Sequence, residues 1–310
     1  MAVDEPYPGD SAVSSSTSAG IASAEDYAEC HRIMKASSRN YSFASRFLPH
    51  RKRHHVEALY ALLRVGDDRV DVSCEGFSSE AEAIANWEQL YWEAFEQGDS
   101  EHPVMRAYLN TALECGIPAG VVTPYFRAMK EDLTITRFPD YAALMHYMNG
   151  SAVPVGRAMT HILGTRAPYA IADALPGADS LSVGMQLSNF WRDIGDDWTC
   201  RGRIYIPQED MDRFGYTEED LAASRINPSL VELLEFEFER TERCYAEARA
   251  SVRMLAVGRW GVMSGLGIYR NILDDIRRHH YDVFTRRAHS TPSQMIMLVA
   301  RSWWQTRRGW

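Results

Sequence analysis

Two stretches of the 310-residue sequence carry polar side chains in a matching order. In the first stretch, "YALLRVGDDRVD", the residues at positions i, i+4, i+7 and i+11 are Tyr60, Arg64, Asp67 and Asp71. In the second, "QLSNFWRDIGDD", the residues at i, i+3, i+7 and i+11 are Gln186, Asn189, Asp193 and Asp197. Residues at these offsets share one face of an α-helix, so each stretch predicts a helix with a polar strip. Each strip ends in two aspartates that lie about 6 Å apart along the helix axis.

Aspartates this close repel one another, and a strip that faces inward therefore needs a cation. A set of oxygen ligands alone suits Mg²⁺, with Mn²⁺ as a substitute, and Mg²⁺ binds carboxylates together with substrate phosphates. A diphosphate is the expected ligand of such a site, and arginine binds phosphate oxygens in a bidentate way. The candidate arginines are Arg39, Arg64, Arg192, Arg201, Arg203 and Arg286.

The alternative is a solvated helix face, which is the usual place for two aspartates four residues apart. Arg192 would then only pair with a neighbouring acid such as Asp193. The apolar residues within the strips favour the interior, because Leu63 accompanies the first strip and Phe190 and Trp191 accompany the second. We therefore expect the two strips to face each other across a cavity lined with carboxylates.

The elements that position these strips are predicted to be helices throughout. Segments such as "RKRHHVEALYALLRV" have apolar residues at helical spacing, and proline and glycine gather between such segments. No stretch alternates long enough for a sheet, and "RIYIP" at residues 203–207 is an isolated extended piece. The pattern indicates an all-α fold with one domain at residues 25–300. Residues 1–24 are expected to form a disordered tail, and residues 301–310 an aromatic and basic tail.

Composition narrows the class of protein. The chain is 45% hydrophobic and 24% charged, as in ordinary globular proteins. Its net charge of -9 argues against a nucleic-acid partner. Five widely spaced cysteines without a CxxC pair indicate reduced cytosolic thiols. No apolar run approaches the length of about 18 residues that spans a bilayer, and the first 20 residues do not resemble a secretory signal. We therefore expect a cytoplasmic protein.

Four segments together resemble the squalene/phytoene synthase family. Two are the signature regions "NYSFASRFLPHRKRHHVEALYALLRVGDDRVD" and "QLSNFWRDIGDDWTCRGRIYIPQEDMDRFG". The others are the central "YFRAMKEDLTITRFPDYAALMHYMNGSAVPVG" and the C-terminal "IYRNILDDIRRHHYDVFTRRA". The resemblance implies an isoprenoid synthase bundle of helices around a central cavity. It also implies a prenyltransferase that condenses two prenyl diphosphates head to head.

The resemblance also implies roles for individual residues. The positions of the magnesium ligands are Asp67, Asp71, Asn189, Asp193 and Asp197. The positions that contact the diphosphate are Arg39, Arg64, Tyr269 and Arg286, and the tyrosines near the reacting centre, where Arg64 also acts, are Tyr60 and Tyr147. Further substrate contacts are expected from Asn40, Tyr41, Ser45, Gln186 and Arg203.

The tracts "DLTITRFPDYAALMHYMNGSA" and "YDVFTRRA" are most similar to bacterial phytoene synthases. This similarity implies that two geranylgeranyl diphosphates give phytoene through a cyclopropylcarbinyl (prephytoene) diphosphate, in carotenoid biosynthesis and without NADPH. The small side chain of Ser45 would leave the substrate pocket deep enough for a long prenyl chain. A C30 member stays open as the alternative, because "NFWRDIGDDW" and "PVGR" also resemble the hydroxysqualene-forming branch. Such an enzyme would make squalene, dehydrosqualene or hydroxysqualene from farnesyl or presqualene diphosphate.

Two further expectations concern the surface. His54 and His55 follow "RKR" and are expected to be exposed. The ending "RSWWQTRRGW" combines tryptophan and arginine, which favour membrane interfaces. Peripheral contact with the inner face of the membrane is therefore a hypothesis for this tail.

Overall fold

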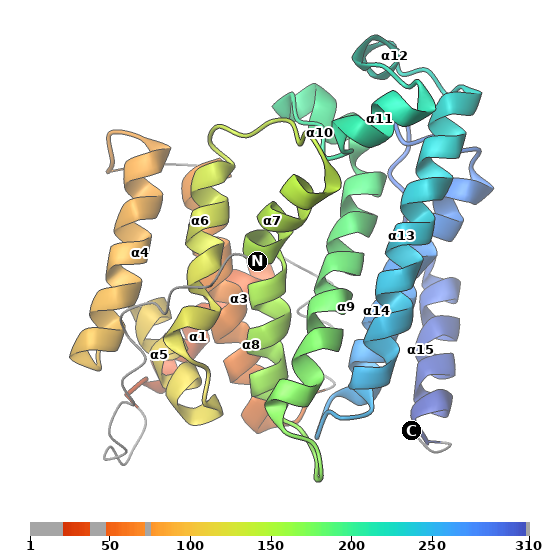
Figure 1. The fold of residues 1–310 in the computed structure, drawn as a ribbon. Helices are drawn as coiled ribbons and strands as arrows, with labels where there is room; N and C mark the ends of the chain where they lie inside the picture. The colour runs from red at the N-terminus through yellow and green to blue at the C-terminus, as the bar shows by residue number, and fades with distance from the viewer. Residues whose placement is uncertain (1–20, 38–47, 72–75, 308–310) are drawn as a thin grey trace, which may run out of the picture.

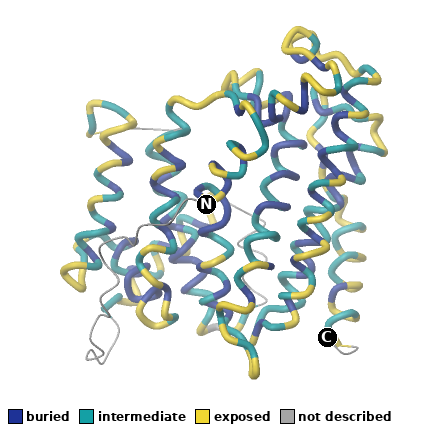
Figure 2. The backbone as a smooth tube through the Cα atoms, in the orientation of Figure 1, coloured by how far each residue is buried: buried dark blue, intermediate teal, exposed yellow. Residues whose placement is uncertain are grey.

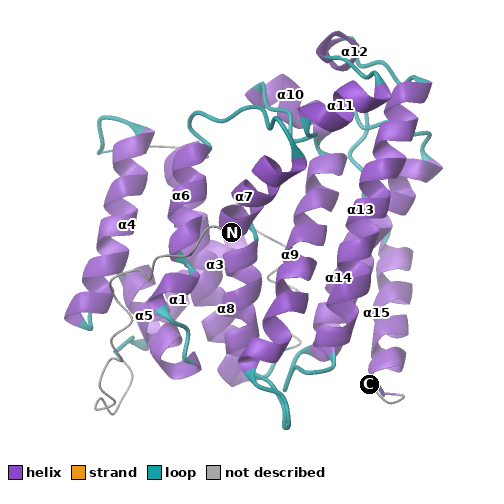
Figure 3. Cartoon of the chain, in the orientation of Figure 1, coloured by secondary structure: helices purple, strands orange, loops and turns teal. Residues whose placement is uncertain are grey.

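The computed structural model of the chain describes residues 21–37, 48–71 and 76–307. These residues form helices and connecting loops, with no strand among them (Figures 1 and 3). In chain order the helices are α1 (Ala24–Ser37), α3 (His50–Asp71), α4 (Glu80–Gln97), α5 (Pro103–Cys115), the 3-10 turn η1 (Ala119–Val121), α6 (Thr123–Glu131), α7 (Tyr141–Ser151), α8 (Val153–Leu163), α9 (Ile171–Arg192), α10 (Ile194–Arg201), α11 (Gln208–Phe214), α12 (Glu218–Ala222), α13 (Pro228–Val252), α14 (Arg259–Arg278) and α15 (Pro292–Arg307). The all-α prediction is confirmed.

Helix α9, which carries most of the second strip, packs along α13 (Figure 1). Gly184 allows the close contact, since a Cβ atom there would lie 3.1 Å from Cε1 of Tyr245. Tyr245 donates its hydroxyl hydrogen to the Gly184 carbonyl at 2.9 Å, and Trp191 donates its Nε1 hydrogen to Thr241 Oγ1 at 2.9 Å. These buried bonds fix the rotation of α9 and therefore the direction of its polar strip.

Helix α3, which carries the first strip, packs against α4, α5 and α6. Trp87 of α4 is completely buried and donates its Nε1 hydrogen to the Leu62 carbonyl at 3.0 Å. Arg69 of α3 lies over the Trp87 ring at 4.7 Å and donates to the Ala83 carbonyl at 2.9 Å. Buried, half-buried and exposed residues alternate along the helices, as expected for helices that bury one face (Figure 2). The predicted central cavity between the strips remains a prediction.

The extended piece predicted at residues 203–207 follows α10. Gly202 ends that helix with a positive φ of 61°, a conformation that glycine adopts without strain. The chain then turns back, so that the Arg203 amide donates to the Asp197 carbonyl at 3.0 Å. Ile204 forms an isolated parallel bridge with Arg137. This turn brings Arg203 next to the second strip.

The ends of the domain remain predictions. Residues 1–20 lie outside the described part, and α1 begins at Ala24. Residues 301–307 belong to α15, which packs on α14. Within the described ranges, no helix is both long and apolar enough to cross a membrane.

Candidate active site

The second strip crosses a break between two helices. We expected one continuous helix, and this expectation was wrong: α9 ends at Arg192, α10 begins at Ile194, and Asp193 between them has φ -104° and ψ 13°. The main-chain bonds still run four residues back, from the Asp193 amide to the Asn189 carbonyl at 2.9 Å and from the Asp197 amide to the Asp193 carbonyl at 2.8 Å. The strip therefore bends, but its residues stay on successive turns.

The bend accommodates the chain that follows α14. The Gly195 amide donates to the Val283 carbonyl at 3.2 Å. A Cβ atom at Gly195 would lie 2.8 Å from that carbonyl oxygen and 2.9 Å from the Phe284 Cα. These contacts are with backbone, which cannot rotate away, so residue 195 must lack a side chain for the C-terminal segment to approach. This approach brings Arg287 to the second strip.

Asp193 is paired with two arginines. Arg192 donates to it through Nε and Nη2 at 2.8 and 2.5 Å, and Arg287 does so at 2.8 and 2.9 Å. Burial alone would raise the pKa of Asp193, but the two guanidinium groups outweigh burial and lower it. Arg192 and Arg287 thus supply the positive charge that the partly buried carboxylate of Asp193 requires. Arg192 thus pairs with a neighbouring acid, as the alternative supposed, and its role as a diphosphate ligand remains a prediction.

The remaining groups of the strip are less fully compensated, because Arg201 and Arg203 only partly oppose the rise in the pKa of Asp197. Burial and the charge of Asp193 raise the pKa of Asp197 to about 6. The Oδ1 atom of Asn189 is buried and has no hydrogen-bond partner among the described residues. An orphaned carbonyl oxygen is costly unless a donor or a cation reaches it. Asn189, Asp193 and Asp197 therefore fit an oxygen-only site for Mg²⁺.

The first strip lies on the C-terminal half of α3. Asp67 accepts a hydrogen bond through Oδ1 from the Tyr125 hydroxyl at 2.8 Å. Arg64 pairs with Asp68 at 2.5 Å, while its own Nε is buried without an acceptor in the described structure. Tyr60 is half-buried one turn before Arg64. Asp71 is the last residue of α3, and its side chain lies outside the described part.

Three aromatic side chains, Tyr147, Phe190 and Tyr205, form an aromatic wall beside the second strip. The rings of Phe190 and Tyr205 stack at 3.9 Å, and Tyr147 lies beside both. Burial raises the pKa of the Tyr147 phenol well above its ordinary value, so this group stays neutral. Asp197, Arg203, Phe190 and Tyr205 line one small cavity. Asp197 of the second strip and the rings of Phe190 and Tyr205 therefore share one space.

Helix α6 contacts the first strip and the chain that follows the second strip. Tyr125 near its start contacts Asp67, and Asp132 caps its end. Arg203 reaches Asp132 Oδ1 at 3.4 Å and bonds to the Asp132 carbonyl. A helix rises about 10 Å over seven residues, so Asp67 and Arg203, whose amide bonds to Asp197, contact the two ends of one short helix. That the strips face one another remains a prediction.

Only some of the other predicted substrate contacts belong to the part of the chain that the structure describes. Arg39, Asn40, Tyr41 and Ser45 lie outside the described residues. Gln186 is half-buried on α9, one turn before Asn189, and Tyr269 is half-buried on α14. Arg286 pairs with the buried Asp275 at 2.7 Å, so in this structure it is engaged with α14 and not with Asp193. Its neighbour Arg287 occupies the position beside the strip.

Sequence reasoning missed three residues at the site, namely Arg287, Tyr125 and Asp132. Helical spacing could not place Arg287, because it lies in a loop 94 residues from its partner. Tyr125 and Asp132 were within the quoted central segment, but nothing in their spacing indicates a contact with α3 or with Arg203. The double arginine in "FTRRA" was the one available signal.

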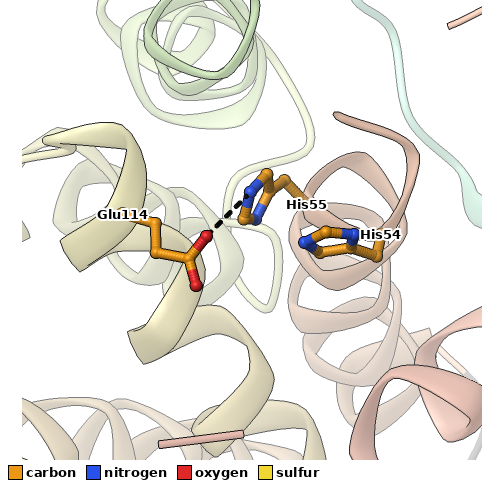
Figure 4. A group of neighbouring side chains, drawn as sticks. All are labelled: His54, His55 and Glu114. Atoms are coloured by element: carbon orange, nitrogen blue, oxygen red, sulfur yellow. Dashed lines mark ion pairs between the residues drawn. The ribbon is translucent and has the colours of Figure 1, made fainter. Parts of the chain in front are cut away.

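A separate group of titratable side chains lies toward the other end of α3 (Figure 4). The prediction that His55 is exposed was wrong: its side chain is buried, and Nε2 lies 3.4 Å from Glu114 Oε2 on α5. Burial and the neighbouring His54 lower the pKa of His55 to about 4. Its Nδ1 also lies 3.0 Å from Thr111 Oγ1. Thirteen helical residues, or about 20 Å, separate His54 from Asp67, so this group is not part of the candidate site.

Comparisons with known proteins point to one family. A family model described as squalene/phytoene synthase matches residues 34–294. The phytoene synthase of Arthrospira platensis is 29% identical over 285 residues, which cover 89% of this chain and 91% of that protein. The phytoene synthase of Cereibacter sphaeroides is 29% identical over 290 residues, covering 91% of this chain and 80% of that protein.

Solved structures share the fold. A dehydrosqualene synthase in complex with a ligand superposes with a TM-score of 0.82 at 26% identity, covering 91% of this chain and 97% of that one. The squalene synthase HpnC from Alicyclobacillus acidocaldarius superposes with a TM-score of 0.74 at 27% identity, covering 83% and 95%. The chain therefore shares the fold of these enzymes.

Proposed function

The chain belongs to the squalene/phytoene synthase family and is a prenyltransferase, and we propose that it joins two geranylgeranyl diphosphates head to head to give phytoene. The reaction would pass through prephytoene diphosphate and would serve carotenoid biosynthesis. Support comes from bacterial phytoene synthases that align with most of the chain. No nicotinamide is required for this product.

The observation that carries the proposal at the site is the orphaned Oδ1 of Asn189 beside Asp193 and Asp197. Carboxylate and amide oxygens suit Mg²⁺, for which Mn²⁺ can substitute. The residues that would hold the metal are Asp67, Asp71, Asn189, Asp193 and Asp197. When bound, Mg²⁺ would withdraw negative charge from the diphosphate and so ease cleavage of the allylic C–O bond.

The arginines of the site would bind the same leaving group. Arg192 and Arg287 neutralise Asp193 in this structure. A diphosphate that arrives with its metal competes for these guanidinium groups, which can then bind phosphate oxygens. Arg64 offers a buried Nε donor that has no acceptor among the described residues. Binding of the diphosphate by Arg286 remains a prediction, and we propose the same role for Arg287.

The aromatic wall would protect the reacting carbons. Ionisation of an allylic diphosphate leaves a carbocation, which water would quench and which aromatic faces stabilise. Tyr147, Phe190 and Tyr205 supply such faces next to Asp197 and Arg203. Because its phenol is neutral, Tyr147 can also orient a diphosphate oxygen by donating a hydrogen bond.

A C30 product is the second candidate. It is favoured by the structural similarity to a dehydrosqualene synthase and to the squalene synthase HpnC. Such an enzyme would act on farnesyl or presqualene diphosphate. The residues proposed above for metal and diphosphate would serve either chain length, because the diphosphate group is common to both substrates.

One experiment separates these functions. Purified protein is incubated with Mg²⁺ and either geranylgeranyl, farnesyl or presqualene diphosphate, with and without NADPH, and the hydrocarbons are identified by mass spectrometry. We expect phytoene from geranylgeranyl diphosphate without NADPH. A product formed only from farnesyl or presqualene diphosphate would establish the C30 function instead.

We also propose a cytoplasmic location with peripheral membrane contact through α15. Its outward face exposes Ile296, Met297, Trp303 and Trp304, and Arg307 lies over the Trp303 ring at 4.2 Å. Tryptophan and arginine together favour the bilayer interface. Co-sedimentation with vesicles that contain anionic lipid should decrease when residues 301–310 are deleted. Unchanged binding would exclude this role for the tail.

A further inference from the structure

The phenol of Tyr125 lies between α6 and the turn of α3 that carries Asp67. Its oxygen is 2.8 Å from Asp67 Oδ1 and 2.6 Å from the Leu63 carbonyl oxygen. We propose that Tyr125 is a positioning residue that sets the Asp67 carboxylate for metal binding. This inference rests on the proposed function, because it concerns a carboxylate assigned there to Mg²⁺.

The hydrogen-bond chemistry suits a carboxylate that gains and loses a metal. A phenol has one hydrogen to donate, and an ionised carboxylate is a stronger acceptor than a carbonyl. A carboxylate keeps lone pairs for a donor when one of its oxygens binds a cation, so the phenol can donate to Oδ1 of Asp67 with or without the metal. Tyr125 therefore restrains Oδ1 of Asp67 through the same hydrogen bond in both states.

The glycine before Asp67 makes this contact possible. A Cβ atom at Gly66 would lie 2.3 Å from the Tyr125 hydroxyl oxygen and 3.0 Å from its Cε1. Gly66 is in the helix and not at a positive φ, so the close approach is the physical reason for a glycine at this position. Any side chain there would displace the hydroxyl from Asp67.

The same turn is anchored on a second side. Trp87 donates to the Leu62 carbonyl at 3.0 Å, and its Cδ1 would lie 3.1 Å from a Cβ at Gly66. Two adjacent carbonyls of α3 thus receive hydrogen bonds from α4 and α6. Groups that orient a metal ligand in this way typically contribute 10- to 100-fold to metal affinity or activity. Tyr125 is expected to contribute within that range.

A purely structural role for Tyr125 predicts a different outcome, and Tyr91 supplies the matched control. Tyr91 is buried on α4 and donates its hydroxyl to the Ala119 carbonyl at 2.6 Å. Tyr125→Phe and Tyr91→Phe each remove one hydroxyl bonded to a carbonyl and retain the ring. Tyr125→Phe in addition removes the bond to Asp67.

The experiment measures binding of Mn²⁺ in the presence of inorganic diphosphate, from the loss of the free Mn²⁺ signal in electron paramagnetic resonance. We expect Tyr125→Phe to raise the dissociation constant about 10-fold or more, with a urea midpoint equal to that of Tyr91→Phe. Equal Mn²⁺ affinity in Tyr125→Phe and wild type, or an equal loss in Tyr91→Phe, would overturn the inference. Wild-type protein that binds no Mn²⁺ would instead refute the proposed metal site.

Gly66→Ala gives a second, independent test. It should weaken Mn²⁺ binding in the wild-type background, because the new methyl group displaces the Tyr125 hydroxyl. In the Tyr125→Phe background the same change should have a smaller effect, since the atom 2.3 Å away is gone. Identical effects in both backgrounds would show that Gly66 does not act through this hydroxyl.

Discussion

Replacing Glu237 with glutamine is expected to remove a large part of the pH dependence of stability between about pH 5 and pH 8. Glu237 lies on α13 and is completely buried. Its two carboxylate oxygens each lie 2.8 Å from Nη1 of Arg240, and the same nitrogen bonds to Asp210 on α11 at 2.9 Å. Two buried carboxyl groups therefore share one guanidinium.

Burial is the main cause that raises the pKa of Glu237 from 4.5 to about 8, and the nearby Asp210 adds to it against the opposing effect of Arg240. At neutral pH the folded state holds a proton that the unfolded state has released. The stabilisation from this group is complete below pH 4.5 and is lost as the pH rises through about 8. The loss amounts to about 1.4 kcal/mol per pH unit, and to about 5 kcal/mol over the whole interval as an upper bound.

Glutamine at position 237 is close in shape to the protonated acid and does not titrate. Free energies of unfolding by urea, measured at pH 5.5, 6.5, 7.5 and 8.5, should be similar for the two proteins at the lowest pH. The variant should exceed the wild type by several kcal/mol at the highest pH. Glu239→Gln, on the exposed side of the same helix, is the control and should follow the wild type. Parallel curves for Glu237→Gln and wild type would refute the reasoning.

Further predictions concern the candidate site. Asp193→Asn should lower the rate of product formation about 1,000-fold or more, because metal ions contribute several kcal/mol to such reactions, while circular dichroism stays native. Gly195→Ala should cost about 1–3 kcal/mol in urea unfolding, since its methyl group would meet the Val283 carbonyl 2.8 Å away. Arg287→Gln should raise the KM for the diphosphate substrate more than Arg286→Gln, whose main effect should be on stability through Asp275. Chelation by EDTA should abolish turnover, and added Mg²⁺ should restore it; activity that survives chelation would contradict the metal assignment.

Local information in the chain accounts for much of the fold and for part of the site. Helical spacing of apolar residues predicted the all-α architecture, because burial of one helix face depends on residues a few positions apart. The same spacing placed Asn189, Asp193 and Asp197 on successive turns, and the adjacency of Arg192 to Asp193 was the basis for the alternative that the two form an ion pair. These features depend on near neighbours in the chain, so the sequence by itself determined them.

Contacts between distant segments were decided only in the tertiary structure. Four features depend on contacts between elements that are far apart in sequence. They are the bend at Asp193, the pairing of Asp193 with Arg287 and not Arg286, the hydrogen bond of Tyr125 across Gly66, and the burial of His55. A one-residue difference in where a loop crosses a helix selects which of two adjacent arginines meets Asp193. The spacing of residues within one helix cannot predict such contacts, because they depend on how the side chains of different helices pack together.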